Sequence, residues 1–379
     1  MKKVLATILA LVMALSVTTM AWADDVAKID GTGYATLQEA VNAANNGQTI
    51  VLQSDVVLTA SLNVAVNKTV TLDLNSYKIT ADMNGPHMIC NAGNLTITDS
   101  SANKTGEIAK IGAETNFGYV IENHGTMTLD RCKISSTSVK SSAIENGWYT
   151  ASANTAGTSC TMTIQNAEVV SVNADGGLYT VKNDDYGVMV INGGVFTNSV
   201  AGAGAVLNWN DLTINGGTFT GASAVRTLKS GSSDFETGKS QIKNGTFNGG
   251  IDTLDGYKTG ITIAVTGGTF STDVTEYLAE GKILQKNGDT YTAVTNSAIT
   301  SGTYTSEPTV PSGYKATKND DGTWTVSKVS YYYYQPTTDT KTTDTKGSPK
   351  TFDAGIALYV GMALTSAAGV AFVGKKRED

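Results

Sequence analysis

Short segments with alternating apolar and polar residues recur along most of the chain, each ending near a glycine or asparagine turn. Val-Ile-Asn-Gly-Gly-Val-Phe at residues 190–196 returns as Thr-Ile-Asn-Gly-Gly-Thr-Phe at 213–219, and shorter forms occupy 243–247 and 265–270. The phenylalanines at positions 196, 219, 247 and 270 are 23, 28 and 23 residues apart. Period-two alternation bounded by turn residues predicts a β-strand in each segment.

The spacing of these segments predicts a solenoid. Earlier segments share the strand without the Gly-Gly pair, at residues 49–52, 71–74, 95–97, 127–129 and 162–164. One unit of this size cannot bury its apolar face, whereas stacked units bury a continuous core. A repeat of 23 residues fits one turn of a parallel β-helix. We expect the phenylalanines to share one interior position, glycine to supply positive φ in the turns, and the turn asparagines to form a hydrogen-bonded ladder.

Two long spacings predict loops on one face of the solenoid. Ile97 and Leu129 are 32 residues apart, and Leu129 and Ile164 are 35 apart. Residues beyond the basic repeat are expected to extrude as loops, where function concentrates in solenoids.

The segment before the first repeat predicts a helix over residues 36–45. Thr36 and Glu39 form a capping box, and Asn46-Gly47 supplies a stop. The apolar residues follow the i, i+3, i+4, i+7 pattern, at Leu37, Ala40, Val41 and Ala44. An open end of a β-solenoid exposes sheet edges, so we expect this helix to cap it.

The two ends of the chain predict export and anchoring. Residues 1–23 combine two lysines, an apolar run and Ala-Trp-Ala, which is typical of a secretory signal peptide cleaved after Ala23. Residues 354–374 contain no charge and would span about 31 Å as a helix, enough to cross a bilayer. Lys-Lys-Arg at 375–377 would hold that end in the cytoplasm.

The order of features near the C-terminus resembles the sorting signal of Gram-positive cell-wall proteins. In that family a sortase cuts a Leu-Pro-x-Thr-Gly motif after the threonine and joins the new carboxyl group to peptidoglycan. Pro349 and Thr351 match the motif, while Ser348 and Phe352 replace its leucine and glycine. The resemblance implies a sortase-type transpeptidase and peptidoglycan as partners. The alternative is a retained membrane anchor through 354–374, and both place the body outside the cell.

The body resembles the pectate-lyase-like superfamily, and more narrowly the β-helix surface proteins of gut Firmicutes. The resemblance rests on Ala-Thr-Leu-Gln-Glu-Ala at 35–40, Gly-Gln-Thr-Ile-Val-Leu at 47–52, and Gly-Gly-Thr-Phe-Ser at 267–271 followed by 277–281. It implies an all-β fold, a right-handed single-stranded parallel β-helix over residues 24–294. The superfamily contains lyases, hydrolases, adhesins and toxins, so it implies no particular activity.

Composition divides the chain after residue 294 into three segments. A partial duplication at residues 295–328 predicts a small β-hairpin module around an Asp-Gly turn. Residues 329–347 are a low-complexity linker, in which tyrosines 331–334 are either part of the tether or a patch that stacks on sugars. Residues 348–379 form the sorting signal.

The net charge and the cysteine content limit which classes of molecule this chain can bind. The chain carries 27 Lys and Arg against 34 Asp and Glu, a net charge of −7, which becomes −9 when the two lysines of residues 1–23 are removed. An acidic chain without a long basic run excludes nucleic acid and disfavours anionic polymers unless a cation bridges them. Cys90, Cys132 and Cys160 lack metal-site spacing and imply no disulfide framework. No cofactor is predicted, although aspartates in turns could hold calcium.

Two groups of residues are candidates for catalysis. Asp130-Arg131 ends a strand shortly after His124 and could serve acid–base chemistry; the alternative is a polar strand end with a local ion pair. Asp184-Asp185 is the one adjacent carboxylate pair in the regular repeats, and glycoside hydrolases use paired carboxylates; the alternative is a turn before the strand at Val188.

Two functions remain open from the sequence. The first is a non-catalytic, adhesin-like surface protein that binds host or dietary glycans or mucus, and the sequence favours it because no complete catalytic set appears. The second is a wall-displayed polysaccharide lyase or glycoside hydrolase acting on uronate-containing or other glycans. Acidic residues converging with Arg131 on one face of the solenoid would favour the enzyme.

Overall fold

The computed structural model describes residues 25–112, 116–137, 140–148, 153–154, 156–172, 178–229 and 238–330. The described residues up to Val329 belong to one compact unit. The expected signal peptide with Ala23, tyrosines 331–334, Pro349, Thr351 and the span 354–374 lie outside the described residues. No helix in the described part of the chain is both long and apolar enough to cross a membrane.

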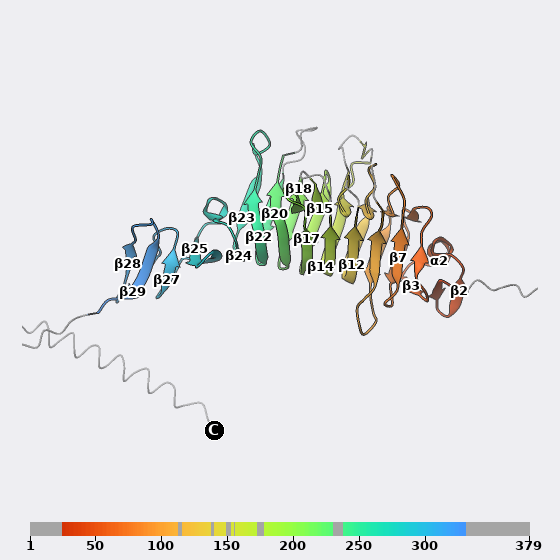
Figure 1. The fold of residues 1–379 in the computed structure, drawn as a ribbon, viewed down its shortest axis with the longest axis horizontal. Helices are drawn as coiled ribbons and strands as arrows, with labels where there is room; N and C mark the ends of the chain where they lie inside the picture. The colour runs from red at the N-terminus through yellow and green to blue at the C-terminus, as the bar shows by residue number, and fades with distance from the viewer. Residues whose placement is uncertain are drawn as a thin grey trace, which may run out of the picture. The chain divides into compact units, whose positions relative to one another are not determined.

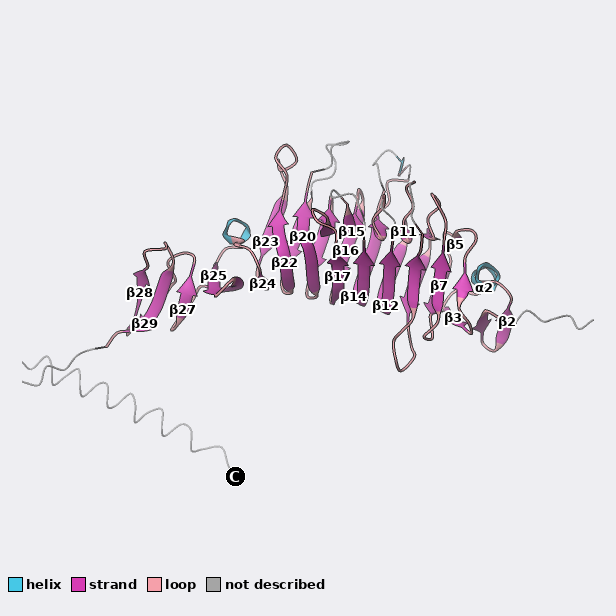
Figure 2. Ribbon diagram, in the orientation of Figure 1, coloured by secondary structure: helices cyan, strands magenta, loops and turns pink. Residues whose placement is uncertain are grey.

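The described chain is an all-β solenoid, as the repeats predict (Figures 1 and 2). Each coil supplies three strands except the last, which supplies β23 and β24 alone, and strands of successive coils pair in parallel to form three ladders that we call A, B and C. Ladder A contains β3 (Gln48–Leu52), β6 (Thr69–Asp73), β9 (Asn94–Thr98), the first halves of β12 (Thr126–Ser136) and β14 (Cys160–Ser171), β16 (Gly187–Ile191), β19 (Asp211–Ile214), β21 (Lys239–Ile242) and β23 (Thr262–Val265).

The other two ladders follow the same order along the chain. Ladder B contains β4 (Val56–Val57), β7 (Lys78–Ala81), β10 (Glu107–Lys110), the second halves of β12 and β14, β17 (Gly194–Asn198), the starts of β20 (Thr218–Thr227) and β22 (Thr246–Asp252), and β24 (Thr269–Phe270). Ladder C contains β5 (Leu62–Val64), β8 (Ile89–Asn91), β11 (Ile121–Asn123), β13 (Ile144–Asn146), β15 (Tyr179–Asn183), β18 (Gly204–Asn208) and the ends of β20 and β22.

The phenylalanines of the repeat occupy one interior position of ladder B, which confirms the prediction. Phe196, Phe219, Phe247 and Phe270 are all buried, and their rings stack nearly parallel with centroid separations of 4.9, 5.0 and 4.9 Å. The same column continues below Phe196 with Val169. The core therefore changes from aliphatic to aromatic along the coil axis.

Asparagine ladders form at two places. In the Asn-Gly-Gly turns, Asn215 Nδ2 donates to Asn192 Oδ1 at 2.8 Å, as the sequence predicts, and both residues are exposed. A longer, buried ladder ends the C strands, where each Nδ2 but the last donates to the Oδ1 one coil further on at 2.7–2.8 Å, and the last, of Asn208, donates to Ser240 Oγ at 3.0 Å. Its members are Asn91, Asn123, Asn146, Asn183 and Asn208. Buried amides need such partners, so this ladder fixes the stacking of the coils.

Backbone conformation and steric crowding explain why the second residue after asparagine in the Asn-Gly-Gly turn is glycine. Gly194 and Gly217 have φ of +113° and +114°, a conformation that favours glycine. A Cβ atom at Gly194 would also lie 2.3 Å from the backbone oxygen of Ala167 in the preceding coil.

The N-terminal end carries the expected helix. Helix α2 spans Leu37–Ala43, and its capping box is complete because Thr36 Oγ1 accepts from the Glu39 N–H and Glu39 Oε2 accepts from the Thr36 N–H. Strands β1 (Ala27–Ile29) and β2 (Thr32–Tyr34) form a hairpin, and β1 pairs antiparallel with β3. The helix buries Leu37, Ala40 and Val41 against this end of the solenoid.

The C-terminal end is closed by antiparallel strands. After the short helix η2 (Thr275–Tyr277), β26 (Thr290–Thr295) pairs with β24 and with β25 (Lys282–Asn287). Strand β27 (Gly302–Tyr304) pairs with β25 and with β29 (Trp324–Lys328), which forms a hairpin with β28 (Tyr314–Lys318). Pairing therefore runs continuously across residue 295, where the sequence suggested a separate module. This end has its own small core, at Ile283, Ile299, Tyr304 and Val326.

Candidate functional site

Ladder C presents a row of side chains on its outer surface that are ionisable at every position except Leu207. In β11, Ile121 and Asn123 are buried inside the coil, so Glu122 between them faces outward. Register pairing extends this position along successive coils, through Cys90, Glu122, Glu145, Lys182, Leu207, Arg226 and Asp252. We call this row the outward column. Parallel pairing separates neighbouring members by about 4.8 Å.

Two histidines flank Glu122. His87 Nε2 lies 3.3 Å and His124 Nε2 3.8 Å from Glu122 Oε1. The Tyr119 backbone N–H donates to His87 Nδ1 at 3.0 Å, which leaves the proton of a neutral His87 on Nε2, facing the carboxyl group. Each imidazole also stacks on an aromatic ring, His87 on Tyr119 at 5.1 Å and His124 on Trp148 at 3.7 Å. The two histidines therefore have fixed orientations.

Glu145, one coil further on, occupies a different environment. Its side chain is 2% exposed, and its Oε1 accepts no hydrogen bond from any described residue, with the Lys182 ammonium 3.9 Å away. Lys182 instead pairs closely with Asp184. Burial, together with the neighbouring Asp184, raises the pKa of Glu145 to about 9, although Lys182 opposes the shift. Glu145 is therefore a neutral carboxylic acid at pH 7.

A cavity of about 300 Å³ opens over these residues. It is lined by His87, Phe117, Tyr119, Glu122 and Glu145. The Tyr119 hydroxyl stays protonated because burial raises its pKa far above the ordinary value, while Phe117 is exposed. Two carboxyl groups, an imidazole and aromatic walls thus share one cavity, a combination suited to hydrogen bonding and proton transfer.

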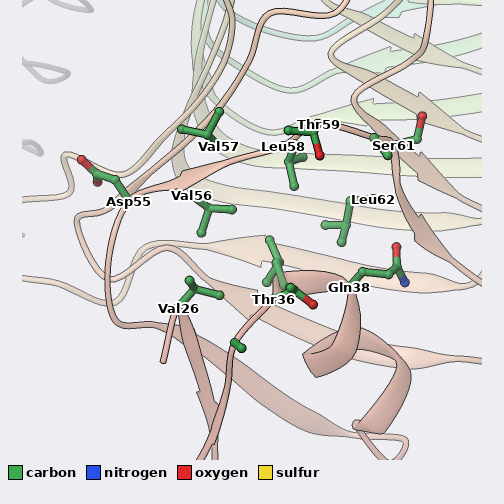
Figure 3. Close-up of a pocket in the computed structure, with 13 residues that line it drawn as sticks. Val26, Thr36, Gln38, Asp55, Val56, Val57, Leu58, Thr59, Ser61 and Leu62 are labelled. Atoms are coloured by element: carbon green, nitrogen blue, oxygen red, sulfur yellow. The ribbon is translucent and has the colours of Figure 1, made fainter. Parts of the chain in front are cut away.

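A second cavity, of about 360 Å³, lies where α2 meets the first coil (Figure 3). Its walls are aliphatic or carry hydroxyl and amide groups, as at Val56, Leu62, Thr36 and Gln38, and Asp55 is its one ionisable residue. This cavity has mostly apolar walls and few ionisable groups, so the cavity on ladder C is the better candidate for a functional site.

Asp130 and Arg131 lie apart from the outward column. They form a bulge at the corner between ladders A and B, and Arg131 has a φ of +51°. The guanidinium pairs with Asp130 at 2.9 Å and donates to Thr98 Oγ1 at 3.3 Å. The geometry matches the alternative interpretation, a polar strand end with a local ion pair.

Asp184 and Asp185 form a buried turn between β15 and β16. Asp184 O accepts from the Gly187 N–H at 2.9 Å, and Asp185 O accepts from the Trp148 N–H at 2.9 Å. The turn interpretation therefore fits the backbone. The Asp184 side chain nevertheless reaches Lys182 and raises the pKa of Glu145. The structure thus brings Asp184 and His124 beside the outward column, where Asp184 pairs with Lys182 and His124 lies 3.8 Å from Glu122.

Sequence reasoning does not find the centre of this site, because no local pattern singles out Glu145, Tyr119 or Lys182. One signal could have found the two glutamates, because Ile-Glu-Asn occurs identically at 121–123 and 144–146, one repeat length apart.

The column continues toward the C-terminal end with a second polar group. Arg226 binds Asp252 through two hydrogen bonds of 2.5 and 3.0 Å, and its guanidinium lies 5.8 Å from the ring centroid of Tyr179. Trp209 and Tyr257 pack edge to face 6.1 Å apart. Aromatic and charged side chains therefore line ladder C over several coils.

The cysteines and possible metal ligands of the described residues bear on the expectations from the sequence. They contain no group of three or more His, Cys, Asp or Glu side chains arranged to hold a metal ion. Cys90, Cys132 and Cys160 form no disulfide, and burial raises the pKa of the Cys90 thiol to about 11, which keeps it protonated.

No known family model matches this chain, and no curated protein or solved structure is significantly similar to it.

The protonation of Glu145 predicts a pH-dependent stability. Between an unfolded pKa of about 4.3 and the folded value of about 9, the folded chain holds a proton that the unfolded chain releases. The free energy of unfolding should therefore fall as pH rises, by up to about 1.4 kcal/mol per pH unit from this group. We expect urea unfolding to show a smaller loss of stability from pH 5.5 to pH 8 in Glu145→Gln than in the wild type.

The exposed Glu280 provides the control for this experiment. Glu280→Gln should keep the wild-type pH dependence. Equal pH dependence in the Glu145→Gln and wild-type proteins would contradict a protonated Glu145.

Proposed function

We propose that this chain is a surface-anchored, right-handed parallel β-helix protein that binds glycans through the outward column of ladder C. The observation that carries the proposal is the cavity in which Glu122, Glu145 and His87 meet the rings of Phe117 and Tyr119. Sugars offer hydroxyl groups to carboxyl and imidazole side chains and C–H faces to aromatic rings, so this lining suits them.

The charge around the cavity favours neutral glycans. Glu122, Asp184 and Asp185 lie at or beside the column, against Lys182 on the column and the buried Lys110, whose ammonium group donates to the backbone oxygens of Pro86 and Gly118. The acidic balance of the whole chain acts in the same direction. A polysaccharide rich in uronate or sulfate would meet repulsion here, whereas an uncharged chain would not.

The ends of the sequence support display at the surface of a Gram-positive cell. Residues 1–23 have the composition of a signal peptide, and residues 348–379 resemble a sorting signal. Attachment would use a sortase-type transpeptidase acting at Thr351, or the span 354–374 as a membrane anchor. The glycan partners would be those outside the cell, on host mucus, food or other cells.

The proposal predicts which aromatic side chain supports binding. Phe117 lines the cavity and is 57% exposed, so Phe117→Ala should cost little stability. We expect the full-length protein to bind at least one linear neutral hexasaccharide of glucose, mannose, xylose or galactose in calorimetric titrations. Phe117→Ala should weaken that binding about tenfold, the effect of losing one ring contact.

Trp324→Ala in β29 serves as the aromatic control and should leave the affinity unchanged. Failure of all four hexasaccharides to bind would overturn the proposal. An equal loss of affinity in both variants would overturn the assignment to ladder C.

A further inference from the structure

We propose that the folded chain joins Lys182 to Asp184 through an intramolecular amide bond, with Glu145 as the group that transfers protons. The three side chains form a buried cluster at the end of β15. Glycan binding neither requires nor excludes this bond, so the inference adds a covalent modification site to the proposed function. The reaction needs no second substrate, because both reacting groups belong to this chain.

The two reacting groups are already in contact. Lys182 Nζ pairs with Asp184 Oδ2, and the two side chains are only 14% and 5% exposed. Lys182 lies on the outward column, and Asp184 follows β15 directly. Asn183 between them is fully buried, so alternation along the chain places Lys182 and Asp184 on the same outer side. The backbone therefore holds the amine and the carboxyl group together without help from a ligand.

The two oxygens of the Asp184 carboxyl group have different surroundings. Oδ1 accepts a hydrogen bond from the Asp185 backbone N–H at 3.0 Å, whereas Oδ2 contacts the Lys182 ammonium group. A backbone N–H directed at one oxygen stabilises the negative charge that develops there when an amine attacks the carboxyl carbon. Oδ1 is thus placed to become the amide oxygen and Oδ2 to leave in water.

Glu145 is placed to move protons between these groups. Its side chain is 2% exposed, its Oε1 lies 3.9 Å from Lys182 Nζ, and it shares a hydrogen bond with Asp184. Burial and the neighbouring Asp184 raise the pKa of Glu145 to about 9 against the opposing charge of Lys182, so it carries a proton at neutral pH. A neutral carboxyl group in this position can give one proton to a leaving oxygen and take one from the amine nitrogen.

Burial favours the amide over the ion pair. An ammonium group and a carboxylate lose their hydration when they are buried, and a neutral amide avoids this cost. The pair of Lys258 and Asp255 provides the contrast within the same chain. These side chains lie 2.7 Å apart and three residues apart in the sequence, but they are 61% and 93% exposed. Both charges stay hydrated there, so we expect that pair to remain ionic.

The reaction is a condensation in which nothing is oxidised or reduced. The Lys182 ammonium group gives one proton to the Asp184 carboxylate, and the resulting amine attacks Asp184 Cγ. The new C–N bond forms and the bond between Cγ and Oδ2 breaks. Glu145 gives its proton to the leaving oxygen and takes one from the nitrogen. One ammonium group and one carboxylate thus become one amide and one water molecule, and Glu145 regains its proton.

The amide would close a covalent ring around a residue of the buried asparagine ladder. Asn183 Oδ1 accepts from Asn146 Nδ2 at 2.8 Å, and Asn183 Nδ2 donates to Asn208 Oδ1 at 2.8 Å. Asn183 lies between the two joined residues, so the ring would fix its backbone where the chain turns from β15 to β16. The bond would therefore hold three successive coils of ladder C in place.

Mass spectrometry of the purified full-length protein tests the bond. Lys182 is the one site for trypsin between Lys140 and Arg226. We expect trypsin to leave residues 141–226 as one peptide that is lighter than its sequence by one water molecule. Chymotrypsin, which cuts after tyrosine, should then release residues 180–186 as a single chain with the same loss of mass.

Variants and the exposed pair provide the controls. Lys182→Arg keeps the charge but should restore the tryptic cut and the full mass of both peptides. Glu145→Gln has nearly the same size but transfers no proton, so it should slow amide formation at least about 100-fold in samples taken after cell-free synthesis. Trypsin should cut after Lys258 in every sample, and the peptide with Asp255 should keep its full mass. Unchanged circular dichroism shows that each variant is folded.

The outcomes decide both the bond and the roles of the residues. Full mass with a complete cut after Lys182 in the wild type would overturn the proposal. Loss of water with that cut intact would also overturn it, because an aspartyl succinimide would then explain the mass. Two chains that stay joined after chymotrypsin would place the bond on Glu145 and overturn the assignment to Asp184. Formation at the wild-type rate in Glu145→Gln would overturn the role of Glu145 in proton transfer.

Discussion

Phe219→Ala is expected to lower the free energy of unfolding by about 3–5 kcal/mol, the usual cost of emptying a buried phenylalanine site. Phe219 is fully buried and stacks on Phe196 on one side and Phe247 on the other, at 4.9 and 5.0 Å. The neighbouring rings are held by β-strands of adjacent coils, so they cannot move in to fill the space. The loss therefore combines transfer free energy with a persistent cavity.

Urea unfolding followed by circular dichroism measures this effect. Val195→Ala is the control, because Val195 precedes Phe196 on the same strand but is 45% exposed, and it should change stability by less than about 0.5 kcal/mol. A loss below 1 kcal/mol for Phe219→Ala would show that the phenylalanine column does not hold the coils together.

Asn146→Leu is expected to lower the free energy of unfolding by about 2–5 kcal/mol, because it leaves two buried groups short of a partner. Asn123 Nδ2 donates to Asn146 Oδ1 at 2.7 Å, and Asn146 Nδ2 donates to Asn183 Oδ1 at 2.8 Å. All three residues are fully buried, so water cannot replace the lost bonds. Leucine has similar size and supplies neither donor nor acceptor.

The exposed ladder of the chain provides the matched control. Asn215 donates to Asn192 in the same manner, but both side chains are exposed to solvent. Asn215→Leu should therefore cost less than about 1 kcal/mol. Equal losses for Asn146→Leu and Asn215→Leu would show that burial does not set the strength of the ladder.

The sequence predicted the parts of the fold that repeat at fixed spacing. Phe196, Phe219, Phe247 and Phe270 follow a strand of four or five alternating residues, so their common interior position was readable. The capping box at Thr36 and Glu39 identified α2 because its chemistry is local. These features depend on residues that are close together in the sequence, so the sequence pattern is enough to predict them.

The candidate site could not be read in the same way. Strands β8, β11 and β13 have three residues each, too short for alternation to be visible. Glu145 and Lys182 become neighbours only when β13 and β15 are set in register across a 37-residue separation. Because the loops between coils differ in length, this register cannot be counted along the sequence. Only the paired strands of the structure show which side chains become neighbours.

Adjacency in the sequence points to a corner of the solenoid away from the outward column. Asp130 and Arg131 are chain neighbours, yet their bulge between ladders A and B lets them pair with each other. The acidic residues instead converge with Lys182 on ladder C, at Glu145 and Asp184. Lys182 pairs closely with Asp184, and burial raises the pKa of Glu145, so the Glu145 carboxyl group stays protonated. The cluster of Glu145, Lys182 and Asp184 therefore differs from a simple surface ion pair.

Hydrogen–deuterium exchange of the full-length protein, with and without each neutral hexasaccharide at saturating concentration, tests most directly whether ladder C is the glycan site. We expect slower exchange at residues 116–124 and 144–148, which surround the cavity, and unchanged exchange in β28 and β29. Protection confined to residues 35–62 at the N-terminal cavity, or to the corner around Arg131, would contradict the assignment.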